Sequence, residues 1–130
     1  MMNLIDTHAH LDGIEDVDVK LQEALKAGVA RIVAVGVDLA SNRVNLDIKK
    51  RCTAPKIFLA FGIHPGNIIS EQIDQTINFI REHKADIVAI GESGLDYWYS
   101  WAKKNDERKQ EQRKVFQLQL DLAKEFNLPI

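Results

Sequence analysis

Four short apolar runs recur along the chain, and three of them are rich in β-branched residues. They cover residues 4–5, 29–37, 57–63 and 87–90, and each ends near a glycine or a polar turn. Runs of this length and composition predict β-strands. Because apolar residues follow one another instead of alternating with polar ones, the strands are expected to belong to a parallel sheet that is covered on both faces.

The segments between these runs have the spacing of amphipathic helices. Apolar residues recur every three or four positions in the first three segments, which stop before Gly28, Cys52 and His83. A longer fourth helix is predicted from about residue 106 to residue 126, with one clear apolar stripe. The positions that define the four helices are Val17, Leu21, Ala24 and Leu25; Val44 and Ile48; Ile73, Ile77 and Ile80; and Val115, Leu118, Leu122 and Phe126.

Each predicted strand is thus followed by one predicted helix. The strands begin near residues 3, 29, 57 and 86, so their starts are 26, 28 and 29 residues apart, the size of one βα unit. Four such units predict an α/β fold with a parallel sheet. A complete TIM barrel takes about 250 residues, so we expect the amino-terminal half of one.

The last four residues, 127–130, have the character of a helix stop followed by the first residues of a fifth strand. We therefore expect a single partial TIM-barrel domain over residues 1–130, truncated before the fifth strand. An open sheet of four strands leaves unpaired edges. Exposed apolar surface on the first and fourth strands is expected as a result, and with it self-association.

Composition excludes several classes of protein. With 45% hydrophobic and 28% charged residues the chain can form a core, which excludes disorder and disulfide scaffolds. Lys and Arg number 17 against 19 Asp and Glu, so an anionic ligand must meet a local basic patch. The single cysteine, the lack of a secretory signal and the lack of a spanning apolar stretch predict a soluble cytoplasmic protein with no membrane partner.

The strongest chemical signal follows the first strand, in the sequence Asp6-Thr7-His8-Ala9-His10. Residues two apart on a strand face the same way, so the imidazoles of His8 and His10 can converge on one ion. Asp6 lies on the same face and is predicted to orient a ligand through an outer hydrogen bond. The alternative is a histidine-rich turn without a metal.

Two further candidates follow the third and fourth strands. Pro65 biases His64 toward an extended backbone, which holds its imidazole at the end of the strand, although a capped loop histidine has the same pattern. Glu92 comes directly after the fourth strand between two glycines, and the alternative for it is a loop-structuring carboxylate. Barrel enzymes build their sites from the carboxyl ends of several strands, so these residues are expected to meet. The fourth histidine, His83, ends a helix and is predicted to be structural.

Two imidazoles and one carboxylate are the donor set of many catalytic zinc sites. The mixture of nitrogen and oxygen ligands also suits Mn²⁺ or Mg²⁺. Such a centre lowers the pKa of water and so predicts hydrolysis, with a second ion, where present, stabilising the opposite oxygen of a phosphoryl group.

Taken together, these motifs resemble the TatD family of metal-dependent deoxyribonucleases, and the resemblance covers nearly the whole chain. One departure is Ser93, which stands where an aliphatic residue is usual in the family. The residues that carry the resemblance are Asp6-Thr7-His8-Ala9-His10-Leu11-Asp12, Gly62-Ile63-His64-Pro65, Gly91-Glu92-Ser93-Gly94-Leu95-Asp96-Tyr97, and Gln112, Phe116, Gln119, Leu120, Leu122, Ala123, Leu128 and Pro129.

The resemblance implies a TIM-barrel hydrolase of the wider amidohydrolase group that cleaves phosphodiester bonds, including those at DNA ends. It implies that His8, His10 and Glu92 are metal ligands, with Glu92 catalytic and bridging two divalent ions in a complete barrel. It also implies that His64 lies near the scissile phosphate. Two further histidines and a catalytic aspartate come from the second half of the family's barrel, so these 130 residues alone are expected to be inactive.

Two other functions fit the same residues. Activated water also attacks carbonyl carbon, so an amidohydrolase that opens amides or lactones is one alternative. The other is a non-catalytic fragment of an interrupted gene, or a half that works only with a partner.

An aromatic stretch precedes the long helix and is followed by cations. Aromatic faces beside cations commonly grip single-stranded nucleic acid, although the same rings could pack the loop against the barrel. The residues are Tyr97, Trp98, Tyr99 and Trp101, then Lys103, Lys104, Arg108 and Lys109.

Overall fold

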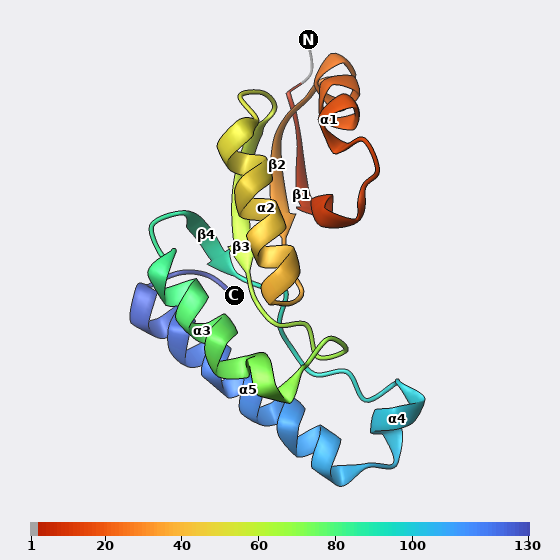
Figure 1. Cartoon of the computed structure of the whole chain (residues 1–130), viewed down its shortest axis with the longest axis vertical. Coiled ribbons are helices and arrows are strands. Elements are labelled where there is room, and N and C mark those ends of the chain that lie inside the picture. Colours follow the sequence, from red (N-terminus) through yellow and green to blue (C-terminus); the bar gives the residue numbers. More distant parts are fainter. Residues whose placement is uncertain (1–2) are drawn as a thin grey trace.

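The computed structural model describes residues 3–130. Met1 and Met2, which belong to the amino-terminal segment considered above, lie outside this range. Strands and helices alternate along the chain (Figure 1). The elements are β1 (Leu4–Ala9), η1 (Leu11–Gly13), α1 (Val17–Lys26), β2 (Val29–Val35), α2 (Leu39–Arg51), β3 (Lys56–Phe61), η2 (Ser70–Gln72), α3 (Ile73–Glu82), β4 (Ile87–Ile90), α4 (Ser100–Lys103) and α5 (Asp106–Phe126).

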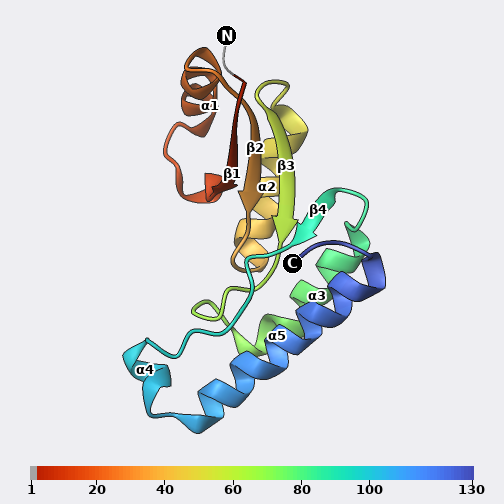
Figure 2. The ribbon, with the colours of Figure 1, turned by 180° about the vertical axis from the view of Figure 1, so that it is seen from behind.

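The four strands form one sheet in the order β1-β2-β3-β4, and every neighbouring pair is parallel. This arrangement confirms the predicted α/β fold of four βα units. Seen from behind, β2 and β3 lie in front of α2, β1 lies between α1 and β2, and α5 runs beside α3 beyond β4 (Figure 2). All carboxyl ends of the strands therefore point to the same edge of the sheet, where the candidate residues were expected.

The core lies between the sheet and these helices. The fully buried Leu59 and Phe61 of β3 and Ile90 of β4 pack with Ile48 of α2 and Leu122 of α5. Burying a side chain of this kind contributes roughly 1.5–3 kcal/mol relative to exposure. The strands, and the loops that follow their carboxyl ends, are thus supported by the buried core between the sheet and the helices.

Strand boundaries differ from the prediction at three places. β2 ends at Val35 instead of residue 37, because the Oγ atom of Ser41 accepts from the N–H groups of Val37 and Asp38, which form the amino-terminal cap of α2. β3 covers Lys56–Phe61, and β1 extends beyond its apolar pair to Ala9 by pairing with β2. The predicted aromatic loop contains the short helix α4.

The ends of β4 and α5 agree with the prediction, whereas the predicted start of a fifth strand after α5 is not a strand in the structure. β4 spans Ile87–Ile90 and α5 spans Asp106–Phe126, as predicted. No strand is assigned within residues 127–130, but the carbonyl of Pro129 accepts a hydrogen bond from the N–H of Ile90 at 2.9 Å. The segment after α5 therefore already lies against β4.

Apolar side chains are exposed on both outer strands. Leu4 and Ile5 of β1 are 44% and 51% exposed, and Val88 of β4 is 40% exposed. This agrees with the exposure expected at the open edges, whereas self-association stays a prediction. Within residues 3–130, no helix has the length and apolar character that crossing a membrane requires.

Candidate metal centre

Three segments bring four titratable side chains together at the carboxyl edge of the sheet. His8 lies in β1 and His10 directly after it, whereas Glu92 and His64 lie in the loops that follow β4 and β3. The Oε2 atom of Glu92 lies 3.5 Å from Nε2 of His8 and 3.4 Å from Nε2 of His10. Its Oε1 atom lies 3.6 Å from Nε2 of His64. The structure thus brings all four predicted residues into one cluster.

The backbone partner of His10 fixes which of its nitrogens can bind a cation. Its Nδ1 atom lies 3.1 Å from the carbonyl oxygen of Val35, and because a carbonyl can only accept, Nδ1 carries the hydrogen. In the neutral ring the Nε2 atom then holds a free lone pair. That lone pair faces His8 Nε2 at 3.2 Å and the carboxylate of Glu92.

His64 has the opposite arrangement. The backbone N–H of Gly66 donates to its Nδ1 atom at 2.9 Å, so Nδ1 accepts and Nε2 carries the hydrogen of the neutral ring. The Nε2–H group faces Oε1 of Glu92. His64 therefore acts in this structure as a donor directed at an anionic oxygen, and His10 as a source of a lone pair.

The loop that carries Glu92 is attached to two strands by backbone hydrogen bonds. The N–H of Gly91 donates to the carbonyl of Phe61, and the N–H of Glu92 donates to the carbonyl of Gly36, each at 2.9 Å. The chain also approaches Gly62 closely, since a Cβ atom there would lie 2.5 Å from the carbonyl oxygen of Glu92. A glycine at position 62 is what lets this loop cross β3 and direct Glu92 toward the histidines.

Two fully buried amides hold the loop that leads to His64. Asn42 of α2 donates to the carbonyl of Gly62 at 3.0 Å and accepts from its N–H group at 3.4 Å. Gln119 of α5 accepts from the N–H of Ile63 at 2.8 Å and donates to its carbonyl at 3.0 Å. Each amide replaces the strand partner that the backbone has lost.

The sequence interpretation assigned no role to Asn42 and included Gln119 only among the residues that carry a family resemblance. A signal for Gln119 exists, because it shares the buried face of α5 with Val115 and Leu122. Glutamine in a core stripe requires buried partners.

Asp6 was predicted to orient a ligand ring. In the structure its Oδ1 atom accepts from the backbone N–H of His8 at 3.0 Å. The ring of His10 is oriented instead by the carbonyl of Val35. Asp6 thus contacts the backbone that carries the first histidine.

The donor set fits a divalent cation. One nitrogen from each of His8 and His10 and one oxygen of Glu92 all lie within 4.8 Å of one another. The side chains of His8, His10 and Glu92 are 54%, 44% and 29% exposed, so the cluster is open to solvent on one side. Two imidazoles and a carboxylate that leave an open position are the arrangement of catalytic rather than structural zinc sites.

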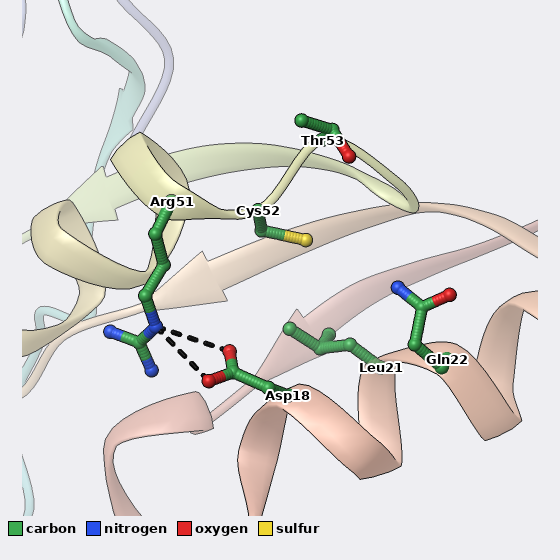
Figure 3. A pocket seen from close by; sticks show the side chains of 6 residues that line it. All are labelled: Asp18, Leu21, Gln22, Arg51, Cys52 and Thr53. Atoms are coloured by element: carbon green, nitrogen blue, oxygen red, sulfur yellow. Dashed lines mark hydrogen bonds and ion pairs between the residues drawn. The ribbon is translucent and has the colours of Figure 1, made fainter.

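His83 and Cys52 lie away from the candidate metal centre. His83 caps the carboxyl end of α3 and pairs with Asp86 at 3.1 Å, as expected of a structural histidine. A cavity of about 230 Å³ between α1 and the turn after α2 contains Cys52 and the ion pair of Arg51 with Asp18 (Figure 3). Burial raises the pKa of the Cys52 thiol, which keeps it protonated.

Comparison with known proteins agrees with this chemistry. The profile of the TatD related DNase family matches residues 5–130. The chain is 38% identical to an uncharacterized metal-dependent hydrolase, YabD, of Bacillus subtilis, over 98% of this chain and 49% of that protein. It is 31% identical to the deoxyribonuclease TATDN3 of Homo sapiens, over 99% of this chain and 51% of that protein.

Solved structures give the same result. The crystal structure of YjjV, a TatD homolog from Escherichia coli, matches with a TM-score of 0.80 and 29% identity, over 97% of this chain and 48% of that one. The chain thus spans about half the length of the curated relatives it matches. The four parallel βα units and the coverage of about half of each relative agree with the amino-terminal half of a TIM barrel.

Proposed function

The chain belongs to the TatD related DNase family of metal-dependent hydrolases, and we propose that it supplies the amino-terminal part of a metal centre that hydrolyses phosphodiester bonds, with DNA as substrate. One observation carries the proposal. One imidazole nitrogen from each of His8 and His10, in and directly after β1, and a carboxylate oxygen from the loop after β4 converge within 4.8 Å, although 82 positions separate His10 from Glu92.

We assign His8, His10 and Glu92 as metal ligands. Neutral imidazoles and an ionised carboxylate suit zinc and manganese, and the carboxylate suits magnesium. When bound, the divalent ion acts as a Lewis acid that activates water and polarises a phosphoryl oxygen. Whether one or two ions bind, and whether Glu92 bridges them, remain predictions.

The other two residues have positioning and binding roles in the proposal. Asp6 holds the backbone N–H of His8 and so fixes the direction of that ligand along β1. His64 presents an Nε2–H group toward the carboxylate, and the same group can donate to a non-bridging phosphate oxygen once a substrate enters. The fixed Nδ1 partner means that no tautomer change is needed for this donation.

Metal titration tests the ligand assignment without relying on activity. Isothermal titration of the chain with Zn²⁺ and Mn²⁺ is expected to give saturable binding, and Glu92→Gln and His8→Gln are expected to lower the affinity by roughly 10–100-fold or more. Two matched controls change the same residue types away from the centre. Glu23→Gln on α1 and His83→Gln on α3 are expected to bind as the unsubstituted chain does.

Cleavage of a labelled single-stranded DNA is then measured with the same ions, beside a simple ester and a simple amide, on the chain extended to the full length of its relatives. Metal-dependent loss of terminal nucleotides that Glu92→Gln removes would support the phosphodiesterase assignment. Faster turnover of the amide or ester would instead favour a carbonyl hydrolase. Equal metal affinity of Glu92→Gln and the unsubstituted chain would refute the assignment of the centre.

A further inference from the structure

The segment between β4 and α5 presents aromatic rings that the metal centre does not use. Tyr97 is the anchor of this segment, because its hydroxyl accepts from Nε of Arg113 at 2.9 Å and the cation of Lys109 lies 5.8 Å from its ring. Gln112 also holds the backbone of Asp96, accepting from its N–H and donating to its carbonyl, both at 2.8 Å. The start of the segment is therefore fixed to α5.

The rings that follow are not used for packing to the same extent. Trp98 is 83% exposed, and Trp101 is 43% exposed. Tyr99 and Trp101 stack on each other with their planes 13° apart and their centroids 5.3 Å apart. Anchoring of the loop accounts for Tyr97, whereas Trp98, Tyr99 and Trp101 keep exposed ring surface, most of it on Trp98, on which a flat ligand could stack.

Cations accompany the exposed rings. Lys103 lies 5.5 Å from the centre of the Trp98 ring. Between residues 97 and 113 the chain has five Lys and Arg and three Asp and Glu, although the whole chain has a net charge of −2. The aromatic segment is thus a local cationic patch on a weakly acidic protein. Because the net charge of the whole chain gives no attraction for a polyanion, a site for one needs such a patch.

The aromatic segment also contacts the loop that carries His64. A Cβ atom at Gly66 would lie 2.9 Å from the hydroxyl of Tyr99 and 3.0 Å from Nδ1 of His64, so Tyr99 packs on the loop that carries His64. Beside it, a cavity of about 180 Å³ is lined by Gly66, Ile68, Trp101 and Arg108. Its lining thus includes an aromatic ring, an apolar side chain and a guanidinium, and Gly66 in this lining donates its N–H to Nδ1 of His64.

Arg108 retains donors for an anion. Its Nη1 atom donates to Glu111 at 2.8 Å, and a guanidinium carries five N–H groups in all. Glu111 also accepts from Ser70, which holds the carboxylate and leaves it less free to block the cavity. A phosphate at the mouth of the cavity could therefore be bound while the ion pair persists.

We propose that Trp98, Tyr99 and Trp101, with Lys103 and Arg108, form a docking face for single-stranded DNA that leads the strand to His64 and Glu92. The inference rests on the proposed function for its substrate class. Bases stack on exposed aromatic faces irrespective of sequence, and the cations bind the backbone between them. Duplex DNA has its bases stacked internally and offers only its phosphates, so the face favours single strands.

The chain provides its own reporter for this test. Its two tryptophans, Trp98 and Trp101, both lie in the docking face, so intrinsic tryptophan fluorescence reports on that face alone. An oligothymidylate of about a dozen nucleotides is titrated in EDTA, without metal or cleavage, and quenching is followed. Saturable quenching is expected, and a duplex of equal length is expected to quench far less.

Variants separate stacking from charge. Trp98→Ala, at a ring that is almost fully exposed, is expected to weaken binding roughly tenfold, as read from the remaining tryptophan. Lys103→Gln is expected to reduce the slope of affinity against salt by about 0.7. The matched control is Lys56→Gln, because Lys56 lies over the ring of Phe58 at 5.2 Å but at the amino end of β3. This control variant is expected to keep the DNA affinity and its salt dependence unchanged.

Three results would overturn the docking face. They are unchanged fluorescence with single strands, unchanged affinity of Trp98→Ala, and equal quenching by inorganic polyphosphate, which has charge without bases. None of these readouts uses metal or Glu92, so they stand apart from the phosphodiesterase assignment. Stacking on this chain without cleavage by the full-length protein would support the face and count against the proposed function, and cleavage by the full-length protein without stacking would do the reverse.

Discussion

The buried amide of Gln119 offers the sharpest test of how the loop before His64 is held. Gln119 is fully buried and forms two hydrogen bonds with the backbone of Ile63, which is itself 3% exposed. The substitution Gln119→Met keeps the length and the absence of branching. It removes both the acceptor and the donor, so the N–H and the carbonyl of Ile63 remain buried without partners.

The expected cost follows from these two groups. Leaving a buried backbone donor or acceptor unsatisfied costs about 1–3 kcal/mol, so the two together cost about 4 kcal/mol. Burying the apolar methionine side chain offsets about 2 kcal/mol of this loss. The free energy of unfolding should therefore fall by about 2 kcal/mol. With a typical urea m-value of about 1–3 kcal/mol/M, the midpoint should fall by about 1 M.

The same helix provides a matched control. Gln117 lies two residues earlier on α5, is exposed, and donates to Asp121 on the surface at 2.9 Å. Gln117→Met makes the same chemical change with similar helix propensity, and should alter the free energy of unfolding by no more than about 0.5 kcal/mol. Urea unfolding followed by circular dichroism measures both. Equal midpoints for the two variants would refute the clamp role of Gln119.

Three further predictions use the same readouts. A Cβ atom at Gly36 would lie 1.9 Å from Oδ1 of the buried Asn42, so Gly36→Ala should lower the free energy of unfolding by about 3 kcal/mol or more. Gly13→Ala is the control and should be close to neutral, because no atom lies within 4 Å of the added Cβ. Similar urea midpoints for the two variants would contradict this prediction. The amide of Asn45 is buried and has no hydrogen-bond partner among residues 3–130, so Asn45→Leu should raise the free energy of unfolding by about 1–2 kcal/mol. Asn42→Leu should lower it, because the amide of Asn42 is hydrogen-bonded to Gly62. A lower free energy in both variants would show that Asn45 has a partner such as a bound water. Because burial raises the pKa of the Cys52 thiol, alkylation of the folded chain should begin at higher pH than alkylation of the urea-unfolded chain. The free energy of unfolding should fall as the pH rises from the thiol pKa of the unfolded chain to that of the folded chain. Coincident alkylation profiles for the two states would exclude the raised pKa.

Elements with clear ends could be predicted closely from the sequence. The apolar run of β4 is bounded by Asp86 and Gly91, and α5 is bounded by Asn105 and Asn127, which the structure places at its two caps. The full length of β1 could not be predicted, because its second half is polar and is set by pairing with β2. Tertiary pairing, which local pattern does not contain, decides such boundaries.

The ligand cluster could be predicted for a simple geometric reason. His8, His10, His64 and Glu92 each follow or end a strand of one parallel sheet, and such ends share an edge. Their hydrogen-bond states could not be predicted. The tautomer of His10 depends on the carbonyl of Val35, which comes from another strand, and neither sequence distance nor residue type indicates that partner.

Loops that leave a sheet lose the ladder of hydrogen bonds that orders their backbone, and at this edge side-chain amides replace it. Asn42, Gln112 and Gln119 each donate to and accept from the backbone around one residue, namely Gly62, Asp96 and Ile63. All three amides are buried, so each bond is protected from competing water. The histidine and carboxylate loops are therefore ordered by α2 and α5 before any cation arrives. Binding an ion then requires little further ordering of the backbone, which is the condition under which a centre that is open on one side can still bind tightly.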